Sequence, residues 1–188
     1  MSNTFVYADL HYGHQATCTV FKWPDGRPLR PWDTQEEMTE TLIQNHNEVV
    51  RPHDKVYILG DLVMHKKHLH HFERLNGDLV LIKGNHDIFH LDLYLKYFRD
   101  IRACQVIDKC VLTHIPIHPA SIERWRMNVH GHLHSNEILL DDGTPDPRYI
   151  CVSIEQPWMN FRPIAWEELK KVATSRGTDL TLPPPKIV

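Results

Sequence analysis

Apolar runs recur along the first half of the chain. Residues 4–8, 55–59 and 79–82 are short and almost continuously apolar, which is typical of strands buried on both faces of a parallel sheet. A helical pattern lies between the first two runs: Thr34 and Glu37 have the spacing of a capping box, and apolar residues follow at helical spacing. The pattern predicts strand, helix, strand and strand, an alternation expected of an α/β domain.

The second half predicts shorter elements. We expect a helix over 91–98, two strands within 101–113 with a turn near Asp108 and Lys109, a strand over 127–130, a hairpin-like pair over 137–140 and 149–154, and a helix over 166–173. These elements predict one domain over residues 1–177. Residues 178–188 are expected to form an extended, proline-rich C-terminal tail.

Composition limits the class of protein. The chain has 188 residues, 41% of them hydrophobic and 24% charged, which suits one globular domain. The net charge of −3 gives no overall basic field for a nucleic-acid backbone, although a local basic pocket remains compatible with it. The four cysteines form no CxxC pair, and no signal-peptide pattern or membrane-length apolar run occurs, so a cytoplasmic protein with reduced thiols is expected.

Polar residues able to bind a metal follow the apolar runs. The segments are Asp9-Leu10-His11, Gly60-Asp61, Gly84-Asn85-His86-Asp87, Thr113-His114 and Gly131-His132-Leu133-His134. In open α/β sheets, the chemistry lies just beyond the carboxyl ends of the strands. Asp9 and His11 are two apart, so an extended backbone would direct both side chains to one ion. Fifteen histidines without cysteine pairs indicate imidazole and carboxylate ligands.

The ordered set of segments resembles the calcineurin-like metallophosphoesterase superfamily. Its motifs D-x-H, G-D, G-N-H-[DE], H and G-H-x-H match here in order over residues 9–134. The beginning also looks like a small single-domain group of bacterial and phage phosphoesterases that read D-x-H-[FY]-G-H. The resemblance implies an α/β fold with two mixed β-sheets packed as a sandwich and flanked by helices.

The resemblance also implies a dinuclear metal centre with seven ligands. One metal would be held by Asp9, His11 and His134, Asp61 would bridge, and the second site would be completed by Asn85, His114 and His132. His86 would be the catalytic residue that faces the scissile phosphate. Mixed nitrogen and oxygen ligands suit Mn, Fe, Zn, Ni or Co better than Mg or Ca, and Mn²⁺ is the first choice to try.

Other histidines have two interpretations. His14 either contacts the substrate phosphate or orients His11, or else it only packs. His118 is a weaker candidate of the same kind, and His130 is expected to be a core or supporting histidine. The histidines and lysines of residues 65–71 have no interleaved carboxylate, which favours a solvated helix face over a metal site; the same helix would send Phe72 and Leu75 into the core.

The loop over residues 22–33 is rich in proline and carries Lys22, Arg27 and Arg30. These cations predict a basic face, either a rim that faces the substrate or a solvated loop. Metallophosphoesterases that act on phosphoproteins read G-D-x-V-D-R-G, whereas Asp61 is followed here by Leu-Val-Met-His. The resemblance therefore favours a minimal phosphodiesterase.

The expected function is hydrolysis of a small nucleotide-like or cyclic phosphate ester with two divalent metal ions. A phosphatase or nuclease acting on RNA or DNA ends is an alternative, and a non-catalytic scaffold of the same fold is another. The expected partner is a small phosphate-ester substrate, with nucleic-acid ends as an alternative and no membrane partner. The sequence leaves the oligomeric state open.

Overall fold

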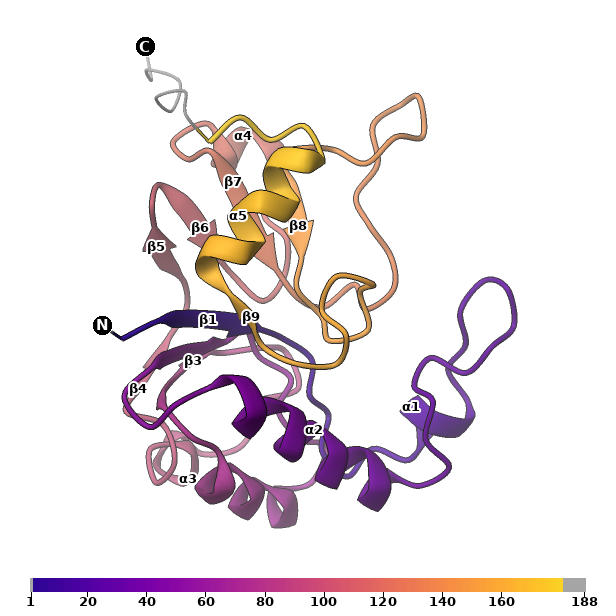
Figure 1. Ribbon diagram of the computed structural model, residues 1–188, viewed down its shortest axis with the longest axis vertical. Helices are drawn as coiled ribbons and strands as arrows, with labels where there is room; N and C mark the ends of the chain where they lie inside the picture. Colours follow the sequence, from indigo (N-terminus) through magenta and orange to yellow (C-terminus); the bar gives the residue numbers. More distant parts are fainter. Residues whose placement is uncertain (1, 181–188) are drawn as a thin grey trace.

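The computed structural model describes residues 2–180, which fold around two β-sheets (Figure 1). The first sheet has the strand order β4-β3-β2-β1-β9. Its strands are β1 (Thr4–Tyr7), β2 (Lys55–Ile58), β3 (Asp78–Ile82), β4 (Asp100–Arg102) and β9 (Ile164–Ala165). Strands β1 to β4 run parallel, and β9 pairs antiparallel with β1.

The second sheet has the strand order β5-β6-β7-β8. Its strands are β5 (Gln105–Ile107), β6 (Cys110–Leu112), β7 (Met127–His130) and β8 (Tyr149–Cys151). Strand β5 pairs antiparallel with β6, whereas β6, β7 and β8 run parallel. Both sheets are therefore mixed, and the two-sheet α/β fold class expected from the resemblance is confirmed.

Helices flank both sheets. They are α1 (Ala16–Thr19), α2 (Gln35–Val49), the 3₁₀ helix η1 (Lys66–Arg74), α3 (Leu91–Tyr94), α4 (Pro119–Ile122) and α5 (Trp166–Ser175). In Figure 1, α2 lies beside the first sheet and α5 runs along the second. None of the helices within residues 2–180 has both the length and the apolar character needed to cross a membrane.

The predictions for the first half are confirmed. Strands β1, β2 and β3 are buried beyond their first residues, because each lies between two other strands of the sheet, with side chains packed on both faces. Helix α2 begins after Thr34, whose hydroxyl oxygen accepts a hydrogen bond from the Glu37 amide at 3.1 Å. Such a cap satisfies one of the free amides at the helix start.

The predicted hairpin over 137–140 and 149–154 is wrong. Residues 137–140 form no strand, and their contact across the loop is one bridge between Leu139 and Pro145. Strand β8 instead pairs in parallel with β7, and the Asn128 amide donates to the Arg148 carbonyl just before the ladder begins. The reason is burial: β8 is wholly buried, whereas Leu139 is 55% exposed and cannot cover it.

Two further boundaries differ from the predictions. The helix expected over 91–98 ends at Tyr94, because the chain turns within a few residues to enter β4. Residues 101–113 therefore contain the end of β4 as well as β5 and β6, with the expected turn at Asp108 and Lys109. At the C-terminus Thr178 is buried and its hydroxyl donates to the Pro147 carbonyl, while the predicted proline-rich segment 183–185 lies outside the described residues.

Candidate metal centre

The two sheets meet at the carboxyl ends of their parallel strands. Ala8 directly follows β1. It forms a parallel bridge with Ser153, which lies two residues beyond the end of β8. The Val152 amide in turn donates to the His130 carbonyl at the end of β7. The segments that follow β1, β2, β3, β6 and β7 therefore converge on one edge of the molecule, although Asp9 and His132, for example, are 123 residues apart in sequence.

Asp9, His11 and His134 form the first cluster. Their nearest ligand atoms all lie within 4.8 Å of one another. Asp9 and His11 are buried, and the His11 and His134 rings stack with centroids 5.2 Å apart. The structure thus brings the predicted first ligand set together.

Asp61, His114 and His132 form the second cluster, with ligand atoms that also lie within 4.8 Å of one another. The Asp61 Oδ1 atom lies 3.3 Å from His114 Nε2. Asn85 joins this group, since its Oδ1 atom lies 2.9 Å from the same His114 nitrogen. All four residues predicted for the second site are therefore adjacent.

Asp61 lies between the two clusters. Its Oδ2 atom is 3.7 Å from His11 Nε2 in the first cluster, while Oδ1 faces His114 in the second. One carboxylate thus presents one oxygen to each cluster, which is the arrangement that a bridging ligand requires. Between residues 2 and 180, these two clusters are the groups of three or more His, Cys, Asp or Glu side chains close enough to share an ion.

The backbone at the ligands is unusual. Nine non-glycine residues of the described chain have a positive φ angle, and five of them belong to the clusters: Asp9, His11, Asp61, His132 and His134. Such conformations cost free energy and concentrate where function requires them. They also correct the expectation for Asp9 and His11, whose side chains converge through left-handed turns and not through an extended backbone.

Glycines let the ligand segments approach one another. A Cβ atom at Gly84 would lie 2.4 Å from Asp61 Oδ1, and one at Gly131 would lie 2.6 Å from Asp9 Oδ2. No side chain fits at either position without displacing a ligand. The glycines of the G-N-H-D and G-H-x-H segments are therefore needed for close packing around the clusters.

The buried ligand atoms fit a cation. Asp9 Oδ1 and both ring nitrogens of His11 are buried without a hydrogen-bond partner, although unpaired buried polar atoms are costly. Burial and neighbouring cations lower the pKa of His11 well below its usual value, so its ring is neutral and has a free lone pair. Burial raises the pKa of Asp9, and a cation beside its unpaired Oδ1 atom would stabilise the charged carboxylate.

Arg30 and Glu155 form a buried ion pair that contacts Asp9 and His134 of the first cluster. The sequence did not predict this role. Arg30 is wholly buried, where it donates to Glu155 Oε1 at 2.6 and 2.8 Å and to the backbone carbonyls of Asp9 and Leu10. The same Glu155 oxygen lies 3.2 Å from His134 Nδ1. The expectation that Arg30 contributes to a basic outer face is therefore wrong, because its guanidinium group is buried and paired with Glu155.

Burial by itself would raise the pKa of Glu155, but Arg30 and His134 outweigh burial and bring that pKa to about 2. The ionised carboxylate orients the His134 ring, as carboxylates commonly do for metal-binding histidines. Ser153 has a similar supporting position, since its hydroxyl donates to Asp9 Oδ2 at 2.6 Å.

Asp87 supports the second cluster. Its carboxylate accepts hydrogen bonds from the amides of Asp61, Leu62 and Gly84 at 2.8 to 3.0 Å. It thereby joins the segment after β2 to the segment after β3. The signal for this role was present in the sequence, as the last residue of Gly84-Asn85-His86-Asp87.

The remaining histidines lie in three kinds of place: at the rim of the two clusters, in the core and on the surface. The His86 side chain is 45% exposed at the rim, with Nε2 3.9 Å from Asp61 Oδ2, and it belongs to neither cluster. His14 is half-buried beside it, 5.5 Å from His11 between ring centroids. His130 is buried against the Gly131 carbonyl, as expected of a core histidine. His118 is exposed and caps α4 by accepting from the Ala120 amide.

The histidine-rich segment forms η1, which is a 3₁₀ helix. Phe72 and Leu75 are buried as predicted, and the lysines are exposed. His68 differs from a solvated position, because it is buried against Gly13. Among residues 2–180, no carboxylate joins these histidines in a metal-binding group, which agrees with the interpretation of η1 as a surface helix.

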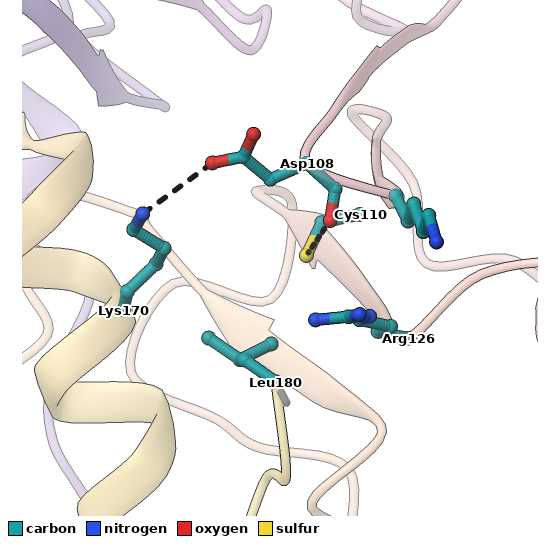
Figure 2. A pocket seen from close by; sticks show the side chains of 6 residues that line it. Asp108, Cys110, Arg126, Lys170 and Leu180 are labelled. Atoms are coloured by element: carbon teal, nitrogen blue, oxygen red, sulfur yellow. Dashed lines mark hydrogen bonds and ion pairs between the residues drawn. The ribbon is translucent and has the colours of Figure 1, made fainter. Parts of the chain in front are cut away.

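A cleft of about 580 Å³ opens beside the clusters. It is lined by His11, His132 and His134 together with His14 and His86. Another cavity, of about 440 Å³, lies at the opposite ends of β6 and β7, where Asp108 and Lys170 form an ion pair at 3.4 Å (Figure 2). That cavity contains none of the predicted ligands, so the first cleft is the candidate active site.

The comparisons with known proteins agree with this architecture. No protein-family model matches the chain. An uncharacterized protein of Methanocaldococcus jannaschii, MJ1445, is 32% identical over 178 residues, which cover 92% of each chain. The fold and the two clusters define an α/β protein with a candidate dinuclear metal centre. Within that class, the chain belongs to the family of this archaeal protein.

Solved structures extend the likeness of the fold. The crystal structure of a protein of unknown function from Aquifex aeolicus, AQ665, matches with a TM-score of 0.66 and 21% identity, over 92% of this chain and all of the other. A novel archaeal phosphodiesterase aligns with a TM-score of 0.45 and 15% identity, over 82% of this chain and 84% of the other. The Aquifex protein shares the fold, whereas the structural similarity to the archaeal phosphodiesterase is too low to support an argument.

Proposed function

We propose that the protein is a metal-dependent phosphoric ester hydrolase, and specifically a phosphodiesterase for small nucleotide-like or cyclic phosphate esters. The observation that carries the proposal is the pair of clusters that share Asp61 beside an open cleft. Two divalent cations held there would stabilise both the attacking and the leaving oxygen of an in-line displacement at phosphorus.

The residues around the clusters have separate roles in this proposal. Asp9, His11 and His134 hold one cation, and Asn85, His114 and His132 hold the other. Asp61 joins the two sites, and its negative charge offsets the repulsion between the cations. The mixed nitrogen and oxygen ligands suit Mn²⁺ as the first metal to test, with Fe, Zn, Ni and Co as alternatives.

His86 is the proposed catalytic residue. Its exposed ring stands over the edge of the cleft next to Asp61, where it reaches a phosphate ester bound at the clusters. From this position the imidazole donates a proton to the leaving oxygen or a hydrogen bond to a phosphoryl oxygen. His14 lines the same cleft and is proposed to contact the substrate phosphate.

The test is hydrolysis of bis-p-nitrophenyl phosphate by protein loaded with Mn²⁺. His86→Ala should lower kcat by roughly 10²- to 10³-fold, the usual effect of losing a hydrogen-bond donor to the charge that develops on the reacting group, while two metal equivalents per chain remain bound. His90→Ala is the matched control, because the His90 side chain follows on the same segment but is 79% exposed. An inactive wild-type protein with both metals bound would disprove the proposal.

A nuclease or an end-processing phosphatase is the second candidate. His65, Lys66, Lys67 and Phe89 line a cavity next to Met64, which itself lines the proposed active site. These lysines offer positive charge to a longer nucleic-acid backbone. Binding of an oligonucleotide would then weaken steeply with added salt, and Lys66→Ala with Lys67→Ala would reduce that dependence.

A scaffold without catalysis is the third candidate, and the metal content separates it from the others. A scaffold has no need of two metal equivalents, whereas a hydrolase of this kind requires both. Elemental analysis of the purified chain therefore decides between the two classes of function.

A further inference from the structure

One wall of the active-site cleft has no role in the proposed metal chemistry. The cleft reaches from His11 and His86 to Phe21 and Lys22, which follow α1. Its volume of about 580 Å³ lies within the usual range of small-molecule sites, roughly 300–1,000 Å³. A phosphate group held at the clusters would occupy only the part of this cleft lined by His11, His132 and His134, and would leave the part beside Phe21 and Lys22 for the rest of the substrate.

Phe21 is exposed but held in place. The side chain is 44% exposed, although phenylalanine is commonly buried. The Phe21 amide donates to the Ala16 carbonyl at 3.0 Å, and the Phe21 carbonyl accepts from the Leu29 amide at 2.8 Å. The ring packs edge to face against His14 with centroids 5.7 Å apart. An aromatic ring fixed in this way offers a flat apolar surface at little cost in conformational entropy.

The segment that carries Phe21 is itself ordered. Lys22 pairs with Pro28 in an antiparallel bridge, and the Trp23 amide donates to the Arg27 carbonyl. The segment stands out from the sheets after α1 (Figure 1). It ends at the buried Arg30, which is bonded to Glu155 behind the first cluster. The position of Phe21 is therefore tied to the position of the metal ligands.

Other side chains that line the same cleft are suited to a planar ring with polar edges. Met64 and Leu133 are half-buried apolar side chains, and Ser135 and Asn136 add hydrogen-bonding groups. A nucleobase has an apolar face and a polar edge, and each of the bases can stack on an aromatic side chain. Lys22, which also lines the cleft, adds one positive charge for an anionic substrate.

We propose that Phe21 is a specificity-determining residue that stacks against the base of a nucleoside phosphate whose phosphate group lies at the two clusters. This proposal rests on the proposed function for the position of the phosphate. It narrows the substrate class to nucleotides and assigns the recognition of the base to the segment after α1.

The test compares the binding of AMP and ribose 5-phosphate, which differ by the base alone, to protein loaded with Mn²⁺ by isothermal titration calorimetry. The wild type should bind AMP at least about fivefold more tightly, as stacking on an aromatic side chain predicts. Phe21→Ala should remove this preference by weakening AMP alone. Phe21→Trp should keep it, as should the matched control Val20→Ala, because Val20 is 65% exposed on the same segment but does not line the cleft.

Three results would overturn the proposal. The first is a wild type with no preference for AMP, whether both probes bind or neither does. The second is a Phe21→Ala variant that keeps the preference, and the third is a variant that weakens both probes equally, which would give Phe21 only a structural role. None of these results depends on hydrolysis, so failure of this proposal is separate from failure to cleave bis-p-nitrophenyl phosphate.

Discussion

At the scale of a single residue, Asp61 is the carboxylate that faces both clusters. It follows β2, has a φ angle of 54°, and places one oxygen toward each cluster. Burial would raise the pKa of Asp61, but its contact with His114 and the field of His86 outweigh burial and lower it. The side chain is therefore ionised, as the proposed bridging role requires.

Asp61→Asn should reduce the bound metal from two equivalents to one or fewer per chain. The amide has nearly the same size but no negative charge to offset the repulsion between two cations. Elemental analysis after gel filtration measures the content directly. Asp92→Asn is the control, since the Asp92 side chain is 79% exposed and should leave two equivalents in place. Retention of both metals by Asp61→Asn would contradict the bridging role.

At the scale of elements, His46 fixes α2 against the first sheet. Its Nδ1 atom accepts from the Tyr7 hydroxyl on β1 at 2.8 Å, and its Nε2 atom donates to the Asn76 carbonyl at 2.8 Å. Both ring nitrogens are thus satisfied in the neutral form, and His46 is wholly buried. Burial lowers its pKa to about 4, although the bond to Asn76 opposes the shift.

This pKa predicts how stability changes with pH. The unfolded chain binds a proton at His46 near pH 6.5, whereas the folded chain does so only near pH 4. The contribution of neutral His46 is therefore complete above pH 6.5 and is lost as the pH falls to 4, by about 3 kcal/mol in total.

Urea denaturation between pH 7 and pH 4, with a chelator present, measures this loss. His46→Gln should flatten the decline in unfolding free energy over that range, whereas His53→Gln, at an exposed position, should follow the wild type. Parallel curves for wild type and His46→Gln would show that another group is responsible.

At the scale of the whole molecule, Arg30 and Glu155 join distant parts of the chain. They are 125 residues apart, both are fully buried, and their bond links the segment after α1 to the segment after β8. A buried pair of charges is costly to break, because removal of one partner leaves the other charge without compensation.

Arg30→Gln should therefore lower the free energy of unfolding by about 3–5 kcal/mol at pH 7. The measurement is urea denaturation of the metal-free protein, which separates the effect from metal binding. Arg27→Gln on the same segment is the matched control, and its exposed side chain predicts a change within about 0.5 kcal/mol. A loss below about 1 kcal/mol for Arg30→Gln would mean that Glu155 is stabilised by other groups.

Local patterns were sufficient for much of the fold. Continuous apolar runs located β1, β2, β3 and β7, and the spacing of Thr34 and Glu37 located the start of α2. The polar residues just after β1, β2, β3, β6 and β7 were the candidate ligands, because parallel strands bring their carboxyl ends to one edge of a sheet, and the resemblance of their order to a known superfamily divided them into two sites. These features depend on residues close together in sequence, so the sequence by itself determined them.

Only the tertiary structure decided the rest. The partner of β8, the burial of Arg30 beside Glu155 and the meeting of Phe21 and Leu133 in one cleft each depend on contacts between distant segments. The spacing of residues carries no direct record of such contacts, because pairing and burial are settled by the packing of the whole chain. An arginine in a proline-rich loop has the same local pattern whether it faces solvent or neutralises a buried carboxylate.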